Sequence, residues 1–357
     1  MNIVIGLIAF LFMLSVIVII HELGHFLTAK KFGVYCKEFS IGMGPAIYQK
    51  PGKETTFSIR AIPFGGYVMM AGEEDGSQNE EEDDWLKEVP QERRLNNIAT
   101  WKQIVVMAAG VCMNIVLAYA LFVGLAMARG YVIEDAKPVV YEVVDNSPAQ
   151  AAGLQKDDEI VKVTNGSEVL EPQRQYDVIE FIQYNPTEST YTIRRGKEEL
   201  ELKITPRYNK ETQTYEIGSI ATSYARPIQW YESFKAGWDD MIDSGMSIFR
   251  SLGQLVKGKG YENLSGPVGI LNLTQKTTQL GLMSYLSLFA LISLNIGIFN
   301  LLPIPALDGG RILILLIERL TGRKINQKIV ENIILASFVL LIGIFLFATY
   351  NDIMKMF

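Results

Sequence analysis

The chain has 357 residues, a formal net charge of −6 at pH 7 and an apolar fraction of 49%. The acidic balance, and the lack of a basic stripe interleaved with aromatic residues, argue against a nucleic-acid partner. The two cysteines, Cys36 and Cys112, lie in or beside apolar stretches, so no disulfide framework is expected.

Four apolar segments approach or exceed the length that crosses a bilayer. The first, residues 3–20, has no basic residue before it and no small-residue cleavage site after it, which argues against a signal peptide. The others are residues 104–128, 280–302 and 333–348, of which the last is short for a span. The pattern predicts an α-helical polytopic membrane protein with about four membrane helices, so the lipid bilayer is an expected partner.

Basic residues in the short loops predict the orientation in the membrane. Lysines and arginines are concentrated between residues 30 and 60, after the first span, and between residues 319 and 328, before the fourth. Both loops are therefore expected on the cytoplasmic side. The N-terminus, a long insert near residues 130–265 and the C-terminus are expected to face outward.

The stretch at residues 35–72 is rich in strand-forming residues. Residues 55–60 and 66–70 flank a Pro-Phe-Gly-Gly sequence, which predicts a β-hairpin with a glycine turn at Gly65 and Gly66. Acidic residues then dominate residues 73–84, a composition typical of a solvated loop.

The outward insert predicts a compact domain of strands and short helices. Residues 138–144 are strand-like, Ser147 and Pro148 suit the start of a short helix, and Asn165-Gly166 is typical of a hairpin turn. Further elements are a helix near residues 176–184 and paired strands at 190–205, and residues 228–256 predict an amphipathic helix. That helix suits either the outer membrane surface or the side of the small domain.

The most informative motif is His-Glu-x-x-His at residues 21–25. Residues four apart on a helix share one face, so His21 and His25 can bind one zinc ion while Glu22 acts as general base toward water. These are the only two histidines in the chain. Two imidazoles and a carboxylate at the end of an apolar helix are costly unless they bind something.

A catalytic zinc ion usually has three protein ligands and one open position. No third histidine is available, so a carboxylate or a cysteine is expected. Prolines and glycines at residues 300–310 would interrupt the third apolar segment, and such backbone is tolerated where it is buried or lines a wet cavity. Asp308 in this segment is the candidate third ligand. The alternative is a plain turn capped by Asp308 at the membrane edge.

Taken together, these motifs resemble the site-2 protease family, specifically its bacterial regulated intramembrane zinc metalloproteases with one PDZ domain. Besides the histidine motif, the residues that carry the resemblance are Asn-x-x-Pro-x-Pro-x-Leu-Asp-Gly at 300–309, Gly-Pro-Val-Gly at 266–269, Phe-Ser-Ile-Gly-Met-Gly-Pro at 39–45, Pro-Phe-Gly-Gly-Tyr-Val at 63–68 and, for the PDZ domain, Ser-Pro-Ala-x-x-Ala-Gly-Leu at 147–154.

The resemblance implies an enzyme with one zinc ion per chain, held by His21, His25 and Asp308, with Glu22 as the base. It further implies that substrate backbone is held by the residues Asn295, Asn300, Gly65 and Gly66. The hairpin would lie in the membrane and pair with an unwound substrate helix, because peptide hydrolysis needs an extended, exposed carbonyl.

The implied function is intramembrane cleavage of single-span proteins such as anti-sigma factors, remnant signal peptides or peptide precursors, after an upstream site-1 protease. The implied location is the bacterial cytoplasmic (inner) membrane, with the active site toward the cytoplasmic side. The expected organisation is a catalytic half at residues 1–130, a PDZ domain at 131–207, an amphipathic linker at 208–265 and a second catalytic half at 266–357.

Two other classes of protein compete with this interpretation. A membrane PDZ scaffold with a structural metal would need the ligands but not Glu22. A metal transporter would be expected to show internal repeats, and none is found. Asn114 in the second span is expected to hydrogen-bond another helix.

Overall fold

The structure is a computed structural model that describes residues 2–73, 85–134, 137–210, 212, 214–221, 224–260 and 264–355. Apart from Glu73, the predicted acidic loop lies outside the described residues. The chain divides into two compact units. The first comprises Met1–Leu125, Phe234–Ile248 and Leu264–Phe357, and the second comprises Ala126–Ser233 and Phe249–Asn263.

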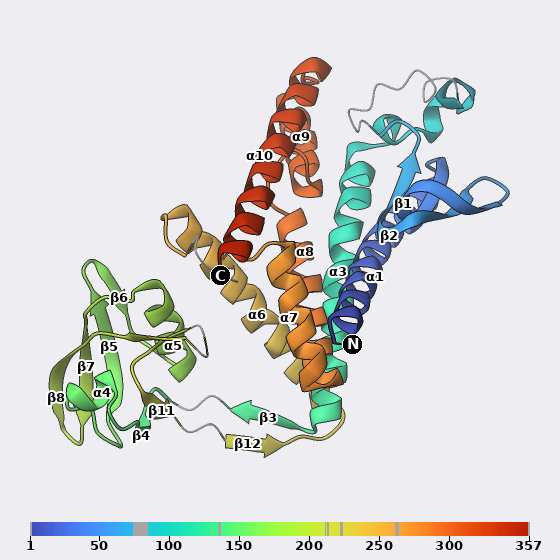
Figure 1. The fold of residues 1–357 in the computed structure, drawn as a ribbon. Helices are drawn as coiled ribbons and strands as arrows, with labels where there is room; N and C mark the ends of the chain where they lie inside the picture. The colour runs from blue at the N-terminus through green and yellow to red at the C-terminus, as the bar shows by residue number, and fades with distance from the viewer. Residues whose placement is uncertain are drawn as a thin grey trace. The chain divides into compact units, whose positions relative to one another are not determined.

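Four helices of the described chain are long and apolar enough to cross a membrane: α1 (Asn2–Lys31), α3 (Thr100–Arg129), α8 (Leu282–Asn300) and α10 (Gln327–Met354) (Figure 1). They correspond to the four predicted segments and identify a membrane protein. Helix α1 continues well beyond residue 20, because no proline or glycine pair interrupts it, and the histidine motif therefore lies within the helix.

The helices of the first unit pack through large apolar side chains. Met13 and Ile17 of α1 are fully buried and contact a cluster on α8. Between these helices lies α7 (Pro267–Leu280), which contacts both. The α8 residues of this cluster are Leu288, Phe289 and Ile292.

The Gly-Pro-Val-Gly sequence begins α7, and it is held by α10. The buried carboxylate of Asp352 accepts hydrogen bonds from the backbone N–H groups of Gly266 (2.8 Å) and Gly269 (2.7 Å). These two groups would otherwise lack partners at the start of the helix. A side chain on Gly269 would collide with the same carboxylate, which explains the second glycine.

The β-hairpin is longer than predicted, and the predicted turn is wrong. Strands β1 (Cys36–Pro51) and β2 (Thr56–Met70) are joined at residues 52–55, where the Gly52 N–H donates to the Thr55 carbonyl at 3.0 Å. Gly65 and Gly66 lie within β2. Gly65 has a φ of 82°, so this left-handed residue bends the strand and does not reverse it.

Both strands bend, so each contributes two short segments to one sheet. Across this sheet the segments lie in the order 46–51, 56–60, 36–41 and 66–70. Alternation of side chains gives this sheet two different faces. Ile41, Ile59 and Tyr48 lie opposite one another and are exposed, whereas the neighbouring rows contain Ser40, Ser58 and Gln49. The hairpin therefore has one polar face and one face with an exposed apolar region.

The second unit has the predicted α+β character. Its main sheet has the order β6-β5-β7-β8, around a core that includes the fully buried Ile160, Val163 and Tyr191. Its elements are β4 (Val140–Val143), α4 (Pro148–Ala151), β5 (Glu159–Asn165), β6 (Glu168–Leu170), α5 (Gln175–Tyr184), β7 (Ser189–Arg195) and β8 (Glu198–Ile204). The Ser147 hydroxyl accepts from the Gln150 N–H, which confirms the predicted start of α4.

Much of the region expected as a linker is folded into this unit. Strands β11 (Ser219–Ala221) and β12 (Tyr224–Pro227) pair with β4 and with β3 (Tyr131–Glu134), and β9 (Arg207–Asn209) pairs with β10 (Thr214–Glu216). The predicted amphipathic helix is present as α6 (Glu232–Val256).

Candidate metal centre

Helix α1 presents His21 and His25 one turn apart on the side that faces α3. Both are buried, with 8% and 6% of their surfaces exposed. Gly24 between them allows this approach, because a Cβ atom there would lie 2.7 Å from the backbone carbon of Ala109. The helix pair thus encloses both imidazoles.

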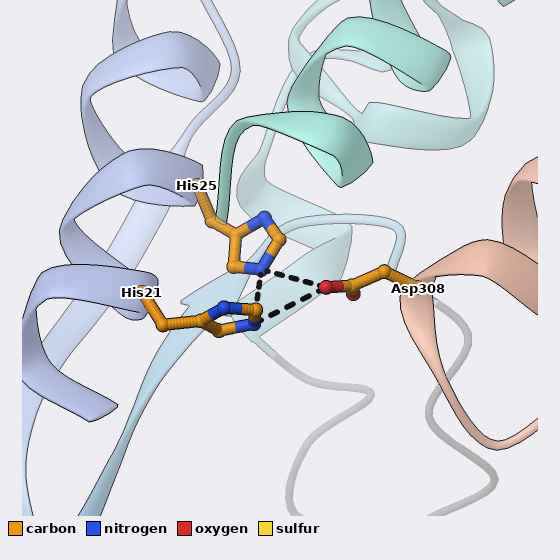
Figure 2. A group of neighbouring side chains, drawn as sticks. All are labelled: His21, His25 and Asp308. Atoms are coloured by element: carbon orange, nitrogen blue, oxygen red, sulfur yellow. Dashed lines mark hydrogen bonds and ion pairs between the residues drawn. The ribbon is translucent and has the colours of Figure 1, made fainter. Parts of the chain in front are cut away.

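Asp308 completes the group from the first turn of α9 (Asp308–Thr321), as Figure 2 shows. Its Oδ2 atom lies 3.1 Å from Nε2 of His21 and 3.5 Å from Nε2 of His25, and the two Nε2 atoms are 3.1 Å apart. The three candidate ligand atoms all lie within 4.8 Å of one another. The structure therefore brings Asp308 to two histidines that lie far from it in the sequence.

The donor set suits a cation. His25 Nδ1 lies 2.8 Å from the Val106 carbonyl oxygen, which can only accept, so this nitrogen carries the proton. In the neutral ring, Nε2 then presents a lone pair toward His21 and Asp308. The buried Oδ2 atom of Asp308 accepts no well-aligned hydrogen bond. Convergent lone pairs in a buried site are unfavourable without a positive charge, and two imidazoles with a carboxylate are a common zinc ligand set.

The glycines after Asp308 determine how it enters the site. A side chain on Gly309 would collide with the carbonyl of Leu301, and one on Gly310 with that of Ile304. Residues 301–307 therefore fold directly over the first turn of α9. This close packing orients Asp308 toward α1.

Glu22 lies beside the group, near enough to interact electrostatically with both histidines and with Asp308. Glu73, at the end of the hairpin, is also within this range of Glu22 and pairs with Arg311 of α9 at 2.6 Å. The ion pair connects the hairpin to the helix that begins with Asp308.

Helix α3 packs against both imidazole rings at Gly110. A Cβ atom there would lie 2.7 Å from Cε1 of His21 and closer still to Nε2 of His25, so both rings rest directly on the backbone of α3. Four residues further along α3, the side chain of Asn114 contacts His21. The contact confirms the prediction that Asn114 hydrogen-bonds another helix, but sequence reasoning did not place it at the metal centre and missed the role of Gly110. The Gly-x-x-x-Asn spacing, which puts both on one helix face, was the available signal.

Within the described chain, no hydrogen bond or ion pair connects the other predicted site residues to the three ligand candidates. Asn295 lies on α8 and Asn300 is its last residue. Gly65 and Gly66 lie in β2, near α1: the Ser15 hydroxyl donates to the Pro63 carbonyl at 2.8 Å, and a side chain on Gly66 would contact Val18. This part of the hairpin therefore runs beside α1 just before His21.

A cavity of about 790 Å³ opens between the start of α3, α9 and the start of α10. Its lining includes Gly72, Glu73, Met107 and Arg311, and thus reaches the surroundings of Glu22. The lining combines charged side chains with many apolar ones, and Glu22 and the three ligand candidates are not part of it.

Zinc metalloproteases commonly bind their metal through two histidines one helical turn apart and a third ligand, with a glutamate beside them, and this site has the same residue types. The model of peptidase family M50 matches residues 9–344, and the chain belongs to this family, the site-2 proteases.

Named relatives agree with this assignment along the whole chain. A Clostridium perfringens protein described as a zinc metalloprotease is 35% identical, covering 99% of this chain and 98% of its own length. The regulator of sigma-W protease RasP of Bacillus subtilis is 30% identical, covering 98% of both chains, and the protease Eep of Enterococcus faecalis is 29% identical, covering 98% and 99%. The protein is a zinc metalloprotease, and its cofactor is Zn²⁺.

Proposed function

We propose that His21, His25 and Asp308 hold one zinc ion per chain and that Glu22 is the general base of peptide hydrolysis. The observation that carries the proposal is the convergence of three ligand atoms within 4.8 Å, from two separate helices, in a buried site. A structural metal site would need these ligands but would have no use for a neighbouring carboxylate.

Bound zinc would polarise the scissile carbonyl and make a water molecule more acidic. Glu22 would take the proton from the attacking water and deliver it to the leaving amide nitrogen. The carbonyl of Val106 keeps the proton of His25 on Nδ1, so that Nε2 stays free for the metal.

The proposed substrates are membrane-spanning segments of single-span proteins, such as anti-sigma factors, remnant signal peptides or peptide precursors, processed after a site-1 protease. Four candidate membrane helices in the described chain favour substrates in the bilayer, and one relative is named as a regulator of sigma-W protease. Residues 66–70 form one outer segment of the hairpin sheet, close to α1, so an unwound substrate could add there as a further strand. In this proposal Gly65 and Gly66 of the hairpin, and Asn295 and Asn300 of α8, hold the substrate backbone.

The proposed location is the bacterial cytoplasmic membrane, with the N-terminus and the inserted unit outward. The basic clusters around residues 30–60 and 319–328 support this orientation. The exposed apolar face of the hairpin supports contact of β1 and β2 with the membrane.

Removing zinc tests the catalytic assignment. We expect a chelator to abolish cleavage of a single-span substrate in detergent and added Zn²⁺ to restore it, because the metal activates both carbonyl and water. The chelator already saturated with zinc is the control. Full cleavage by protein shown to be metal-free would contradict the proposal.

We also propose that the second unit is a PDZ domain that binds a newly made C-terminus. Strand β11 pairs with β4 on one side and exposes Ile220, while α5 exposes Tyr176 and Ile179. A peptide could add to the strand while its carboxylate meets backbone N–H groups. A size barrier against uncut substrates is the alternative.

Peptide binding to the full chain separates these two roles. A peptide with a free C-terminal carboxylate should bind at least about tenfold more tightly than its amidated form, because charge-assisted hydrogen bonds contribute more than ~1.4 kcal/mol. Ile220→Glu should weaken this binding. If neither peptide binds and cleavage instead falls as the substrate's outer domain grows, the unit acts as a barrier.

A further inference from the structure

Asn114 is a fully buried polar residue on α3, with 0% of its surface exposed, and the hydrolytic steps above do not use it. Its backbone carbonyl accepts a hydrogen bond from the Ser293 hydroxyl of α8 at 2.9 Å. Its side chain points to the metal centre, where the amide nitrogen lies 3.3 Å from Nδ1 of His21. Its amide oxygen has no hydrogen-bond partner.

This arrangement of the amide conflicts with metal binding by His21. If the amide nitrogen donates to Nδ1, the proton of the neutral ring must sit on Nε2, and that nitrogen cannot then bind zinc. The oxygen and nitrogen of an asparagine amide are assigned from their hydrogen bonds, since the two orientations have nearly the same shape. A half-turn of the amide places the unpaired oxygen at Nδ1, where it can accept the proton of His21.

We propose that Asn114 is a positioning residue that accepts a hydrogen bond from Nδ1–H of His21 and thereby directs Nε2 toward zinc. It would do for His21 what the Val106 carbonyl does for His25. The rotation gives the amide oxygen a donor and gives both imidazoles the same tautomer, while the amide nitrogen moves to the position where the oxygen has no partner. Ser293 holds the backbone of Asn114 in place from α8. The inference rests on His21 being a zinc ligand, as proposed above.

Two variants with the same number of side-chain heavy atoms as asparagine test whether Asn114 acts as a hydrogen-bond acceptor. Asn114→Leu removes the acceptor, whereas Asn114→Asp keeps an acceptor and loses the donor. Partners of metal-bound histidines typically contribute 10–100-fold to metal affinity. We therefore expect the zinc dissociation constant, measured by chelator competition, to rise about 10–100-fold in Asn114→Leu and to stay near the wild-type value in Asn114→Asp. Asn332→Leu, on an exposed position of α10, is the matched control.

The two histidines also give a direct spectroscopic test. In zinc-loaded protein labelled with ¹⁵N-histidine and purified without a histidine tag, only His21 and His25 contribute imidazole signals. The Nδ1–H signal of His21 should shift in Asn114→Leu, because its proton loses its acceptor. The signal of His25, bonded to Val106, should not, and it reports that the helices remain packed.

The outcomes also distinguish this inference from the proposed function. Wild-type zinc affinity in Asn114→Leu, equal losses in the Leu and Asp variants, or an unchanged His21 signal would overturn the role of Asn114. A wild-type chain that binds no zinc would instead overturn the metal centre itself.

Discussion

Replacing Glu22 with glutamine should reduce cleavage about 10²–10⁴-fold while leaving one zinc ion per chain. Glutamine has nearly the same shape but cannot take a proton from water, and general-base catalysis contributes this range of rate. Glu22 lies beside the three ligand candidates without being one of them, so the metal should remain bound. The measurement is the turnover rate on a single-span substrate, together with zinc content.

The control for this substitution is Glu92→Gln, the same chemical change at an exposed position of the first unit. It should leave both readouts unaltered. Wild-type turnover in Glu22→Gln would assign the base to another group. Loss of zinc along with activity would instead make Glu22 part of the metal site.

Replacing Gly110 with alanine should also damage the metal centre, although Gly110 carries no reactive group. The added methyl would overlap His25 Nε2 and lie 2.7 Å from His21 Cε1, so the rings or the helices must move apart. Ligand displacement of about 1 Å can cost about 10²-fold in rate. We expect weaker zinc binding, measured by chelator competition, and a turnover loss of about that size.

The same helix offers a matched control for Gly110→Ala. A Cβ atom on Gly124 would meet nothing within 4 Å, so Gly124→Ala should keep normal zinc affinity and turnover. It should also stabilise α3, since alanine favours a helix over glycine by about 1 kcal/mol. If Gly110→Ala behaved like Gly124→Ala, the close packing of the imidazoles on α3 would be refuted.

The hairpin shows where reasoning from the sequence failed. Gly65 and Gly66 carried a strong turn signal, but the structure uses Gly65 to bend β2 and turns the chain at residues 52–55. A positive φ suits both a turn and a bend, and only the pairing with β1 decides between them. The strands at residues 207–227 were missed because each is short and lacks the length over which alternation can be detected.

Short stretches of the sequence were sufficient to predict many features of this protein. Long uncharged runs predict membrane helices wherever they occur, and two histidines four apart on a helix predict a metal-binding face, because both signals depend on neighbours in the chain. Asp308 could be named as a candidate from its broken helix, but its approach to the histidines depends on the folding of residues 301–307 over Gly309 and Gly310.

Only the tertiary structure decided what surrounds the histidines. Helix α3 supplies three contacts to the imidazoles, although the whole hairpin separates it from the histidine motif in the sequence. The backbone at Gly110 packs against both rings, the Val106 carbonyl lies at His25, and the Asn114 amide lies at His21. Contacts of this kind depend on the packing of one helix against another. A glycine and an asparagine four residues apart acquire a function only where that packing brings imidazole rings against them.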